Sequence, residues 1–393
     1  MPRGESRRSD ATRATLAGLA FAATLALVPA VHAASPVKLR VLTWNVWGLP
    51  VASSNMEERL AALPDAIAKL DPDIVLLQEL WEESAGIRVR QGLERHGYRY
   101  ASHLAHTSFG MTGLFTASKL PLENVGFLPF ASGRIGHSIW HLEWIASKGV
   151  GRFVVQTPLG PLEVQNTHLQ AQYDTDGYAA ERLSQVGEIV SMHQDRSLPL
   201  VLGGDFNTGS EELPRKALIA LDTLQDTTPS PRPDTIFVRN GEAVRVRLLA
   251  TRPALTEPVR LENGVTTELS DHPAVLVDLE LSSCTACAPE AAGDTTTTRA
   301  ATRSALITAA AITPFRITLA LSTAASLLAV AISIFRRTRR LGGRSWRFRA
   351  LRQTTLALLA TGFVWTAYLG ALYYPARAKA LREVARELEL PPP

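Results

Sequence analysis

The sequence predicts a layered α/β fold followed by two membrane-spanning helices. Short apolar strands alternate with amphipathic helices between residues 37 and 282. A Pro-Leu-Gly-Pro turn at residues 158–161 joins two of these strands as a hairpin, and this favours packed sheets covered by helices over an all-parallel barrel. Near the end of the chain, residues 317–335 and 354–374 form two uncharged apolar runs. Each approaches the ~20 residues that a spanning helix needs.

The individual elements follow from the spacing of apolar residues. Helical spacing predicts a helix over residues 56–70 that ends at Asp71-Pro72, a helix before Gly97, and a third over residues 180–193. Short apolar runs bounded by turn residues predict strands over residues 39–46, 74–77, 152–157, 162–167, 198–202, 235–238 and 274–281.

The charge is distributed unevenly along the 393 residues. The formal net charge is +4, yet residues 35–283 carry 22 basic and 30 acidic residues, so the basic excess lies at the two ends. A protein that binds nucleic acid through its phosphates usually presents a basic face. The acidic central region therefore makes nucleic acid the less expected partner.

The first 34 residues have the pattern of a signal peptide. Basic residues precede an apolar stretch at residues 16–28, Pro29 interrupts it, and residues 31–33 offer small side chains for cleavage. A retained N-terminal anchor is the alternative, although the stretch is short for a membrane span. The Arg7-Arg8 pair also leaves twin-arginine export open.

The two apolar runs near the C-terminus predict a membrane hairpin. Eight arginines and no acidic residue lie between them. The positive-inside rule places this connection in the cytoplasm and both flanks outside, which agrees with an N-terminal signal peptide. A buried soluble hairpin with a basic turn is the alternative.

Five segments make up the expected organisation. They are a signal peptide over residues 1–34, a globular domain over 35–283, a flexible Ala- and Thr-rich linker over 284–315, two transmembrane helices with a basic cytoplasmic loop over 316–375, and a short tail over 376–393. Residues 376–390 of the tail have the pattern of a short amphipathic helix without an assigned function. The linker contains both cysteines, Cys284 and Cys287. They are expected to form a local disulfide in an oxidising compartment, because a redox-active pair would need a thioredoxin-like context that is not seen.

Polar residues gather at the ends of the expected strands, where a layered fold collects a site from distant parts of the chain. They are Asn45, Glu79, His168, Asp205, Asn207, Asp234, Asp271 and His272. Singly, such residues are usually turn, capping or structural groups. Together they offer an oxygen ligand for a metal, a histidine base beside an acid, and polar groups for an oxyanion. Metal-assisted phosphodiester hydrolysis requires this combination.

Two local patterns strengthen this interpretation. In Gly203-Gly204-Asp205-Phe206-Asn207 the glycines allow a tight turn, so that Asp205 and Asn207 can face one ligand. Asp271 directly precedes His272 and could orient its ring. No Cys/His cluster has zinc spacing, so Mg²⁺ is the expected cofactor, with Mn²⁺ as a possibility.

Six motifs occur in the chain in a recognisable order. They are Trp44-Asn45, Gln78-Glu79, Thr167-His168-Leu169, Gly204-Asp205-Phe206-Asn207, Asp234-Thr235-Ile236-Phe237 and Ser270-Asp271-His272-Pro273. With them, residues 38–282 resemble the endonuclease/exonuclease/phosphatase superfamily. The resemblance implies an α/β fold of the four-layer α-β-β-α sandwich type, with two sheets face to face and helices outside.

Within the superfamily, the chain looks most like the neutral sphingomyelinases and related phospholipase C-type enzymes. The segments that carry this likeness are residues 45–50, 144–150 and 167–173. The resemblance implies that Glu79 ligates Mg²⁺ with help from Asn45, and that His272, oriented by Asp271, is the general base. It further implies that His168 and Asn207 stabilise charge on the phosphoryl oxygens. Asp205 and Asp234 would position the water, the metal or the leaving group.

The sequence thus predicts a membrane-tethered, extracytoplasmic phosphodiesterase. The expected partners are a membrane phospholipid as substrate, with sphingomyelin first, and the bilayer around the C-terminal helices; no protein partner is indicated. A membrane-tethered nuclease is the second hypothesis, because the same metal chemistry cuts nucleic acid. A binding module without turnover is the third, and the complete set of catalytic residues argues against it.

Overall fold

The computed structural model describes residues 35–50, 53–105, 111–131, 147–173, 178–193, 196–228, 233–285, 287, 295–339 and 346–389. The expected signal peptide and residues 144–146 of one family-like segment lie outside these residues. The chain divides into two units, residues 1–35 and 36–393. All elements discussed below belong to the second unit.

Two six-stranded sheets form the centre of the fold. The first has the order β11-β14-β1-β2-β4-β3, and the second has the order β5-β6-β7-β8-β10-β9. β1 is parallel to β2 and β7 is parallel to β8, whereas the other neighbours are antiparallel. The strands of the first sheet are β1 (Val37–Gly48), β2 (Ile74–Leu80), β3 (Tyr100–Ala105), β4 (Met111–Ser118), β11 (Val244–Ala254) and β14 (Ala274–Ser283). Those of the second are β5 (Leu122–Pro129), β6 (Gly149–Thr157), β7 (Gly160–His168), β8 (Leu200–Asp205), β9 (Gln225–Asp226) and β10 (Asp234–Arg239).

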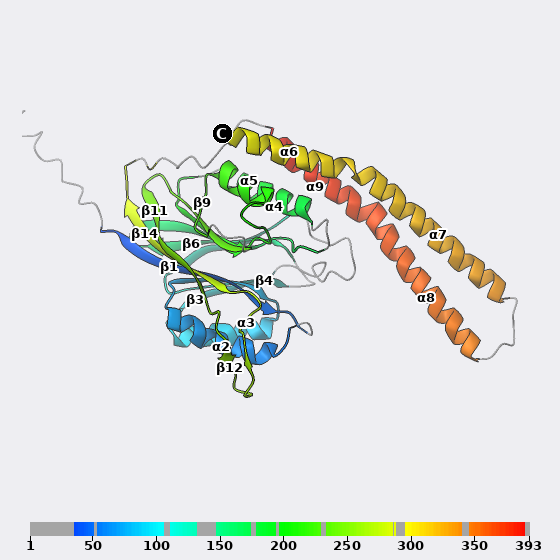
Figure 1. The fold of residues 1–393 in the computed structure, drawn as a ribbon, viewed down its shortest axis with the longest axis horizontal. Coiled ribbons are helices and arrows are strands. Elements are labelled where there is room, and N and C mark those ends of the chain that lie inside the picture. The colour runs from blue at the N-terminus through cyan, green and yellow to red at the C-terminus, as the bar shows by residue number, and fades with distance from the viewer. Residues whose placement is uncertain are drawn as a thin grey trace, which may run out of the picture. The chain divides into compact units, whose positions relative to one another are not determined.

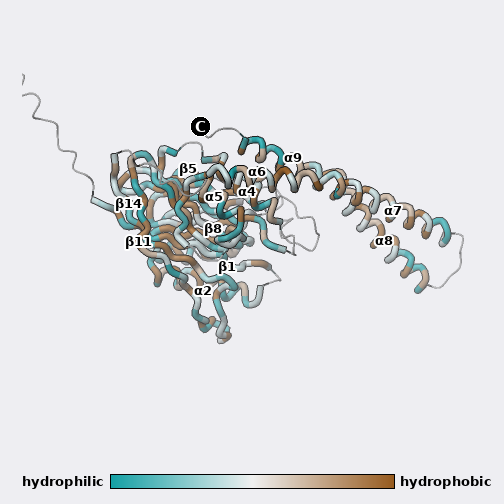
Figure 2. The backbone as a smooth tube through the Cα atoms, turned by 45° about the horizontal axis from the view of Figure 1, so that its top comes forward, coloured by the Kyte–Doolittle hydropathy of each residue, from teal (hydrophilic) through white to brown (hydrophobic). Residues whose placement is uncertain are grey.

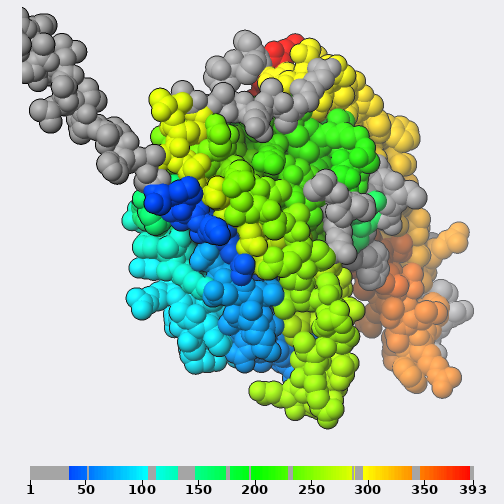
Figure 3. Space-filling model, turned by 60° about the vertical axis from the view of Figure 1, so that its left-hand side comes forward, coloured from blue at the N-terminus to red at the C-terminus, as the bar shows by residue number. Residues whose placement is uncertain are grey.

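Helices cover the outer face of each sheet, as Figure 1 shows. α2 (Met56–Leu70) and α3 (Glu83–Arg95) lie on the first sheet, and α4 (Ala179–Met192) and α5 (Leu213–Asp222) lie on the second. A small separate hairpin, β12 (Val259–Arg260) and β13 (Thr266–Thr267), precedes β14. The expected four-layer sandwich is therefore confirmed. Figure 3 shows the surface on the side where β1 begins, with the early elements in blue and cyan beside the later ones in green.

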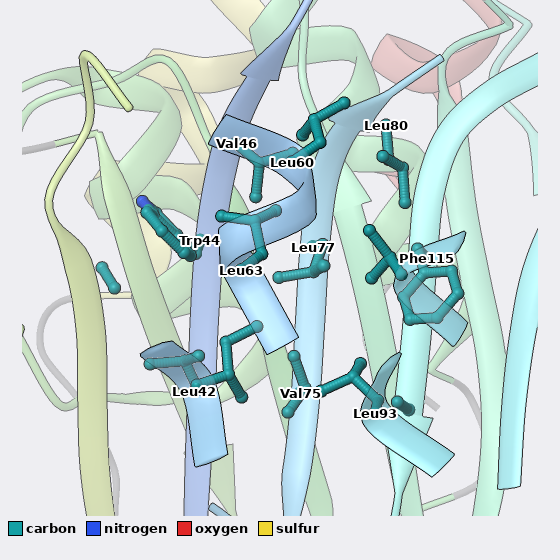
Figure 4. Close-up of a cluster of buried hydrophobic side chains, with 14 of the residues drawn as sticks. Leu42, Trp44, Val46, Leu60, Leu63, Val75, Leu77, Leu80, Leu93 and Phe115 are labelled. Carbon is teal, nitrogen blue, oxygen red and sulfur yellow. The ribbon is translucent and has the colours of Figure 1, made fainter. Parts of the chain in front are cut away.

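Burial of apolar side chains explains the layering. One cluster fills the space between the sheets and contains Val41 and Leu76 of the first sheet with Val164 and Val201 of the second. A second cluster lies between the first sheet and its helices. Figure 4 shows part of it, including Trp44, Leu77 and Leu63. The side chains labelled in Figure 4 are fully or almost fully buried. Burial of each such side chain stabilises the fold by about 1.5–3 kcal/mol relative to exposure.

The expected strands and helices all occur. Alternation did not reveal β3, β4, β5 and β11. The strands β3, β5 and β11 lie at sheet edges, and many of their positions are exposed or half-buried. β4 is buried, but Thr112, Gly113 and Thr116 interrupt its apolar residues. α5 was also missed. It is a ten-residue helix whose Pro214 stands in the first turn, where proline is tolerated because the N–H it lacks has no partner inside the helix.

The prediction of a flexible linker over residues 284–315 is wrong for most of its length. α6 (Thr295–Ala311) occupies it. The short amphipathic helix expected within the tail is confirmed as α9 (Tyr374–Glu387). α6 and α9, named here the helical arm, pack on α4 and α5 through buried residues that include Leu306 and Leu381. Alanine favours a helix, and tertiary burial orders a segment whose composition resembles that of a linker. The expected disulfide between Cys284 and Cys287 is present.

Two further helices continue the arm. α7 (Thr313–Arg339) follows α6, and α8 (Trp346–Tyr368) leads through a π-helical turn (Leu369–Tyr373) into α9. Both are long and apolar enough to span a membrane, and only 11% of their most apolar stretches is buried. Figure 2 shows them brown along much of their length, with teal at the end of α7 and the start of α8.

Candidate active site

The polar residues singled out from the sequence converge at one edge of the two sheets. Asn45, Glu79, His168 and Asp205 all lie at or near the carboxyl ends of their strands. The strand register then places His168 opposite Asp205, and Asp205 opposite Asp234. His272 lies two residues before β14, which runs antiparallel to β1. The topology therefore brings residues from six strands or strand ends to this edge, named here the catalytic edge.

Asn45 links the two sheets at the centre of the site. It is 2% exposed, and its Nδ2 donates to Glu79 Oε1 and to Asp205 Oδ2, each at 3.0 Å. Burial raises the pKa of the Glu79 carboxyl. Its second oxygen, Oε2, is buried without a protein partner. A buried carboxylate oxygen of this kind is suited to a hard cation such as Mg²⁺.

Glu79 also adopts an unusual backbone conformation. Its φ of 60° lies in the left-handed region, which is uncommon for residues other than glycine, asparagine and aspartate. Such strain persists where the surroundings impose it, and it clusters at functional sites. The conformation coincides with a register irregularity between β1 and β2, beyond Asn45.

Asp205 and His168 face each other across the parallel pair of β7 and β8. His168 Nε2 lies 3.6 Å from Asp205 Oδ2 and 4.0 Å from Glu79 Oε1. Burial, with a contribution from Lys148, lowers the pKa of His168 to about 3, so the ring is neutral. Burial also opposes the charged form of Asp205, but His168 and His272 outweigh it and hold the pKa of Asp205 below its usual value.

Asn207 completes the turn after β8. Its φ is 48°, a left-handed conformation that asparagine tolerates. Its backbone N–H donates to Asp205 Oδ1 at 2.9 Å, and its side-chain Nδ2 donates to the Leu169 carbonyl at 3.1 Å. The turn therefore places Asp205 and Asn207 at the same edge. Whether both side chains face one ligand, as the glycine-rich motif suggests, stays a prediction.

Asp234, and not Asp271, is the partner of His272. His272 Nδ1 lies 2.7 Å from Asp234 Oδ2. Asp271 is exposed and accepts a hydrogen bond from Ser270 Oγ at 3.3 Å instead. The expectation that Asp271 orients His272 is therefore contradicted. Adjacent residues at a strand entrance point in different directions, whereas the register of β8 and β10 brings Asp234 to the site from another strand.

Asp234 and His272 are in direct contact, and the pKa of each lies above its usual value. Burial, reinforced by Asp205, raises the pKa of Asp234 to about 6. Burial acts against the charged form of His272, but the hydrogen bond and charge of Asp234 raise the pKa of His272 to about 10. Asp234 Oδ1 is buried and has no protein partner.

Three of these groups could also share a cation. Among the described residues, Asp205, Asp234 and His272 each offer a ligand atom, and these atoms lie within 4.8 Å of one another. The sequence had assigned metal binding to Glu79 and Asn45. The geometry thus offers carboxylate oxygens on both sides of Asn45, contributed by both sheets.

Several supporting residues were missed from the sequence. Arg59 is fully buried and donates to the carbonyls of Val46, Trp47 and Leu269, which join the end of β1 to the segment before His272. Its position on the buried face of α2 was a sequence signal, because a buried arginine needs acceptors. The same two segments are joined by Trp44 Nε1, which donates to the His272 carbonyl at 2.8 Å.

A second group of missed residues joins the sheets beneath the site. Gln78 Nε2 donates to Asn166 Oδ1 at 2.8 Å, and Asn166 Nδ2 donates to the carbonyls of Leu77 and Phe115, each at 3.0 Å. Lys148, 2% exposed, donates to the Leu169 carbonyl at 3.1 Å. All three belong to segments that the sequence analysis quoted, but no pattern there marked their side chains.

With the geometry in place, the comparisons with known proteins identify the family. The family model described as "Endonuclease/Exonuclease/phosphatase family" matches residues 42–272, and the chain belongs to this family. The matched region begins in β1 and ends at His272, so it contains every predicted site residue.

The curated relatives carry related names. The chain is 27% identical over 275 residues to "Putative neutral sphingomyelinase" of Drosophila melanogaster, covering 62% of this chain and 61% of the relative. It is 31% identical over 205 residues to "Inositol phosphosphingolipids phospholipase C" of Schizosaccharomyces pombe, covering 51% and 48%. It is 30% identical over 182 residues to human "Sphingomyelin phosphodiesterase 2", covering 45% and 43%. The chain thus spans between 43% and 61% of the length of these relatives.

Among solved structures, sphingomyelinase C from Streptomyces griseocarneus superposes with a TM-score of 0.50 at 19% sequence identity. The match covers 62% of this chain and 99% of that protein. At this identity the likeness concerns the fold, and it supports the sandwich described above.

Proposed function

We propose that this protein is a metal-dependent phosphodiesterase that hydrolyses the headgroup of a membrane phospholipid, with sphingomyelin as the first candidate. The observation that carries the proposal is the convergence of Asn45, Glu79, His168, Asp205 and His272 at one sheet edge. The names of the curated relatives support the choice of a sphingolipid.

Glu79 is the residue that we assign to the cation, which would be Mg²⁺ or Mn²⁺. Asn45 assists by donating its Nδ2 to the Glu79 and Asp205 carboxylates, while its Oδ1 accepts from the Trp47 backbone N–H. The unpartnered Glu79 Oε2 and the raised pKa of its carboxyl both fit a site that gains from a positive charge. Asp205 shares Asn45 with Glu79 and would complete the oxygen ligands. A bound Mg²⁺ would polarise the phosphoryl oxygen and offset its charge.

His272 is proposed as the general base. The hydrogen bond between its Nδ1 and Asp234 fixes the ring orientation. The raised pKa of His272 would keep the ring protonated near neutral pH. A cation bound at Glu79 and Asp205 would lower that pKa, so that Nε2 could take a proton from the attacking water. General base catalysis contributes about 10²–10⁴-fold to the rate. Asp234 replaces Asp271 in the orienting role, and Asp271 has no assigned role in this scheme.

His168 and Asn207 are proposed to stabilise the phosphoryl oxygens in the transition state. The neutral His168 ring can donate one hydrogen bond without adding a permanent charge to the buried site. Donors fixed before the reaction cost no reorganisation when charge develops, and one such donor contributes about 3–4 kcal/mol. The assignment follows the family resemblance, and the buried position of His168 supports it.

The membrane helices support a lipid substrate in this proposal. α7 and α8 would confine the enzyme to the plane in which phospholipids lie. The arginine-rich connection between them favours a cytoplasmic loop and an extracytoplasmic catalytic domain. The N-terminal signal-peptide pattern favours the same topology.

The experiment that tests the function uses the full chain in detergent micelles with Mg²⁺. Sphingomyelin, phosphatidylcholine and double-stranded DNA are supplied in parallel. Glu79→Gln is the site variant, and Glu83→Gln, which changes an exposed acid at the start of α3, is the matched control. We expect phosphocholine release from sphingomyelin by the wild type and the control, and loss of that release in Glu79→Gln or in EDTA.

Two other results would overturn parts of the proposal. Cleavage of DNA alone would establish the nuclease hypothesis and remove the lipid substrate. Full activity of Glu79→Gln would remove the metal assignment, since that variant keeps the shape of the side chain and loses only its charge.

A further inference from the structure

α4 connects the catalytic edge to the helical arm. Its first turns lie beside the chain that leaves β7 after His168. Gln185 Oε1 accepts from the Gln170 backbone N–H at 2.9 Å, and Arg182 donates to the Gln170 carbonyl at 3.3 Å. The N-terminal end of α4 therefore lies at the same end of the molecule as the catalytic edge.

The contacts of α9 show which way it runs along α4. Glu181, in the first turn of α4, accepts from Arg377 Nε and from Arg377 Nη2, the latter at 3.2 Å. At the other end of both helices, Ser191 Oγ donates to Glu387 at 2.6 Å. α9 is thus parallel to α4, and it begins at the end where the catalytic edge lies.

α6 runs in the opposite direction. Arg377 Nη1 donates to the Ala309 carbonyl near the end of α6, at 3.4 Å. Near its start, Arg299 donates to the Leu388 carbonyl at 3.3 Å and Arg303 donates to Glu389 at 2.8 Å. Both connections to the apolar helices, from α6 into α7 and from α8 into α9, therefore leave α4 at its catalytic-edge end. Figure 1 shows this arrangement.

The charge pattern places the membrane boundary at the same level. Residues 317–335 and 353–376 carry no charged side chain, and the flanking charges on this side are Arg316 and Arg377. Arg377 contacts Glu181 directly. α4 begins at this boundary, and its 14 residues span about 21 Å at 1.5 Å per residue. The far end of α4 therefore lies away from the boundary.

We propose that the helical arm holds the catalytic edge against the bilayer that α7 and α8 span, so that the enzyme takes phospholipid headgroups from its own membrane. The partner surface is thus a lipid bilayer in cis. This inference rests on the proposed function and adds the orientation of the site, which a flexible linker would leave free.

The contact between Gly187 and Val384 offers a way to test the orientation without touching the catalytic edge. A Cβ atom added at Gly187 of α4 would lie 2.2 Å from Val384 Cγ1 of α9, which is closer than atoms can approach. Gly187→Leu should therefore separate α9 from α4. Val384→Ala removes the methyl groups that collide, so the double variant with Gly187→Ala should restore the packing.

The assay uses the full chain reconstituted in vesicles that contain headgroup-labelled sphingomyelin. A second arm carries the label only in separate acceptor vesicles, and a third supplies the water-soluble bis(p-nitrophenyl) phosphate. For the wild type we expect cis lipid cleavage to exceed trans cleavage by at least about tenfold, as confinement to one membrane implies. For Gly187→Leu we expect cis cleavage to fall by at least about tenfold, with the soluble diester unchanged. The Gly187→Ala/Val384→Ala pair should match the wild type.

The other possible outcomes refute either the orientation of the catalytic edge or the proposed function. The orientation role is refuted if Gly187→Leu keeps full cis activity. It is also refuted if Gly187→Leu remains folded by circular dichroism and loses lipid and soluble activity in the same proportion. If Gly187→Leu does not fold, Gly187→Ala alone replaces it and the same ratios are read. Absence of any Glu79-dependent cleavage in the wild type would refute the proposed function itself. Cleavage of the soluble diester without cis lipid cleavage would refute only the present inference.

Discussion

The catalytic edge and the helical arm are built in opposite ways. At the catalytic edge, polar side chains from distant strands meet through a few directed hydrogen bonds, such as those of Asn45 Nδ2 to Glu79 and Asp205. In the arm, α6 and α9 pack on α4 and α5 largely through aliphatic side chains, with the Glu181–Arg377 ion pair among them.

This difference explains why the catalytic edge could be recognised in the sequence more readily than the helical arm. Directed chemistry restricts residue types, so the edge leaves recognisable motifs. Apolar packing accepts any side chain of suitable volume, so the Ala- and Thr-rich residues of α6 carry no comparable motif. The motifs of the catalytic edge indicate the function, whereas the proposed orientation of the catalytic edge depends on the packing of the helical arm.

The largest expected effect concerns the partner of His272. Asp234→Asn should lower kcat by about 10²–10⁴-fold, because the ring loses its charged acceptor and the amide N–H can hold it in the wrong tautomer. Steady-state kinetics with a soluble phosphodiester measure the change.

Asp271→Asn is the matched control for this prediction. Asp271 is exposed and contacts Ser270, so kcat should stay within about threefold, as for most surface substitutions. A large loss in Asp271→Asn together with a small loss in Asp234→Asn would restore the pairing that the sequence suggested.

The fold of the globular domain could be predicted well because its strands are strongly patterned. β1, β2 and β8 are almost continuously buried, and their apolar runs are visible in the sequence. The site residues could be predicted because each follows such a run. The pairing of His272 could not, since it depends on the register between β8 and β10, which no local pattern specifies.

The packing of the helical arm, and the helix α6 itself, could not be predicted for a different reason. Leu306 and Leu381 are fully buried, but their partners lie more than 70 residues away in sequence. Helix periodicity in such short segments does not say which surface will bury them. The sequence therefore predicted a linker in place of α6. It predicted α9 as a short amphipathic helix without a packing surface, and the two apolar helices between them correctly by their length.

The next largest effect tests whether the arm belongs to the folded domain. Leu306→Ala removes a fully buried side chain from the arm's contact with α4 and α5 and should lower the free energy of unfolding by about 2–5 kcal/mol. Denaturant unfolding of the full chain in detergent, followed by circular dichroism, measures this change.

The neighbouring Ile307→Ala provides the comparison on the same helix. Ile307 is 42% exposed, and its truncation should change the free energy of unfolding by about 0.5 kcal/mol or little more. Equal, small effects of both substitutions would show that α6 behaves as a linker after all.

A smaller effect is expected at the link between the sheets. Asn166→Ala leaves the Gln78 amide and the carbonyls of Leu77 and Phe115 without their buried partner, which should cost about 1–3 kcal/mol. The thermal midpoint should fall accordingly. Gln156→Ala, which removes an exposed hydrogen bond to Glu123, should leave the midpoint almost unchanged. If the two variants melt alike, the polar link does not stabilise the contact between the sheets.

The smallest effect is expected for the disulfide between the globular domain and the helical arm. The Cys284–Cys287 disulfide closes a loop with a sequence separation of only three residues, and disulfides constrain the unfolded chain less when their loops are short. Replacing both cysteines with serine should therefore cost about 2 kcal/mol or less. Because the bond lies outside the catalytic edge, kcat should not change. Differential scanning fluorimetry and kinetics on one preparation check both statements. A loss of cis lipid cleavage in this variant, with soluble activity intact, would mean that the disulfide helps the arm to hold the catalytic edge at the membrane.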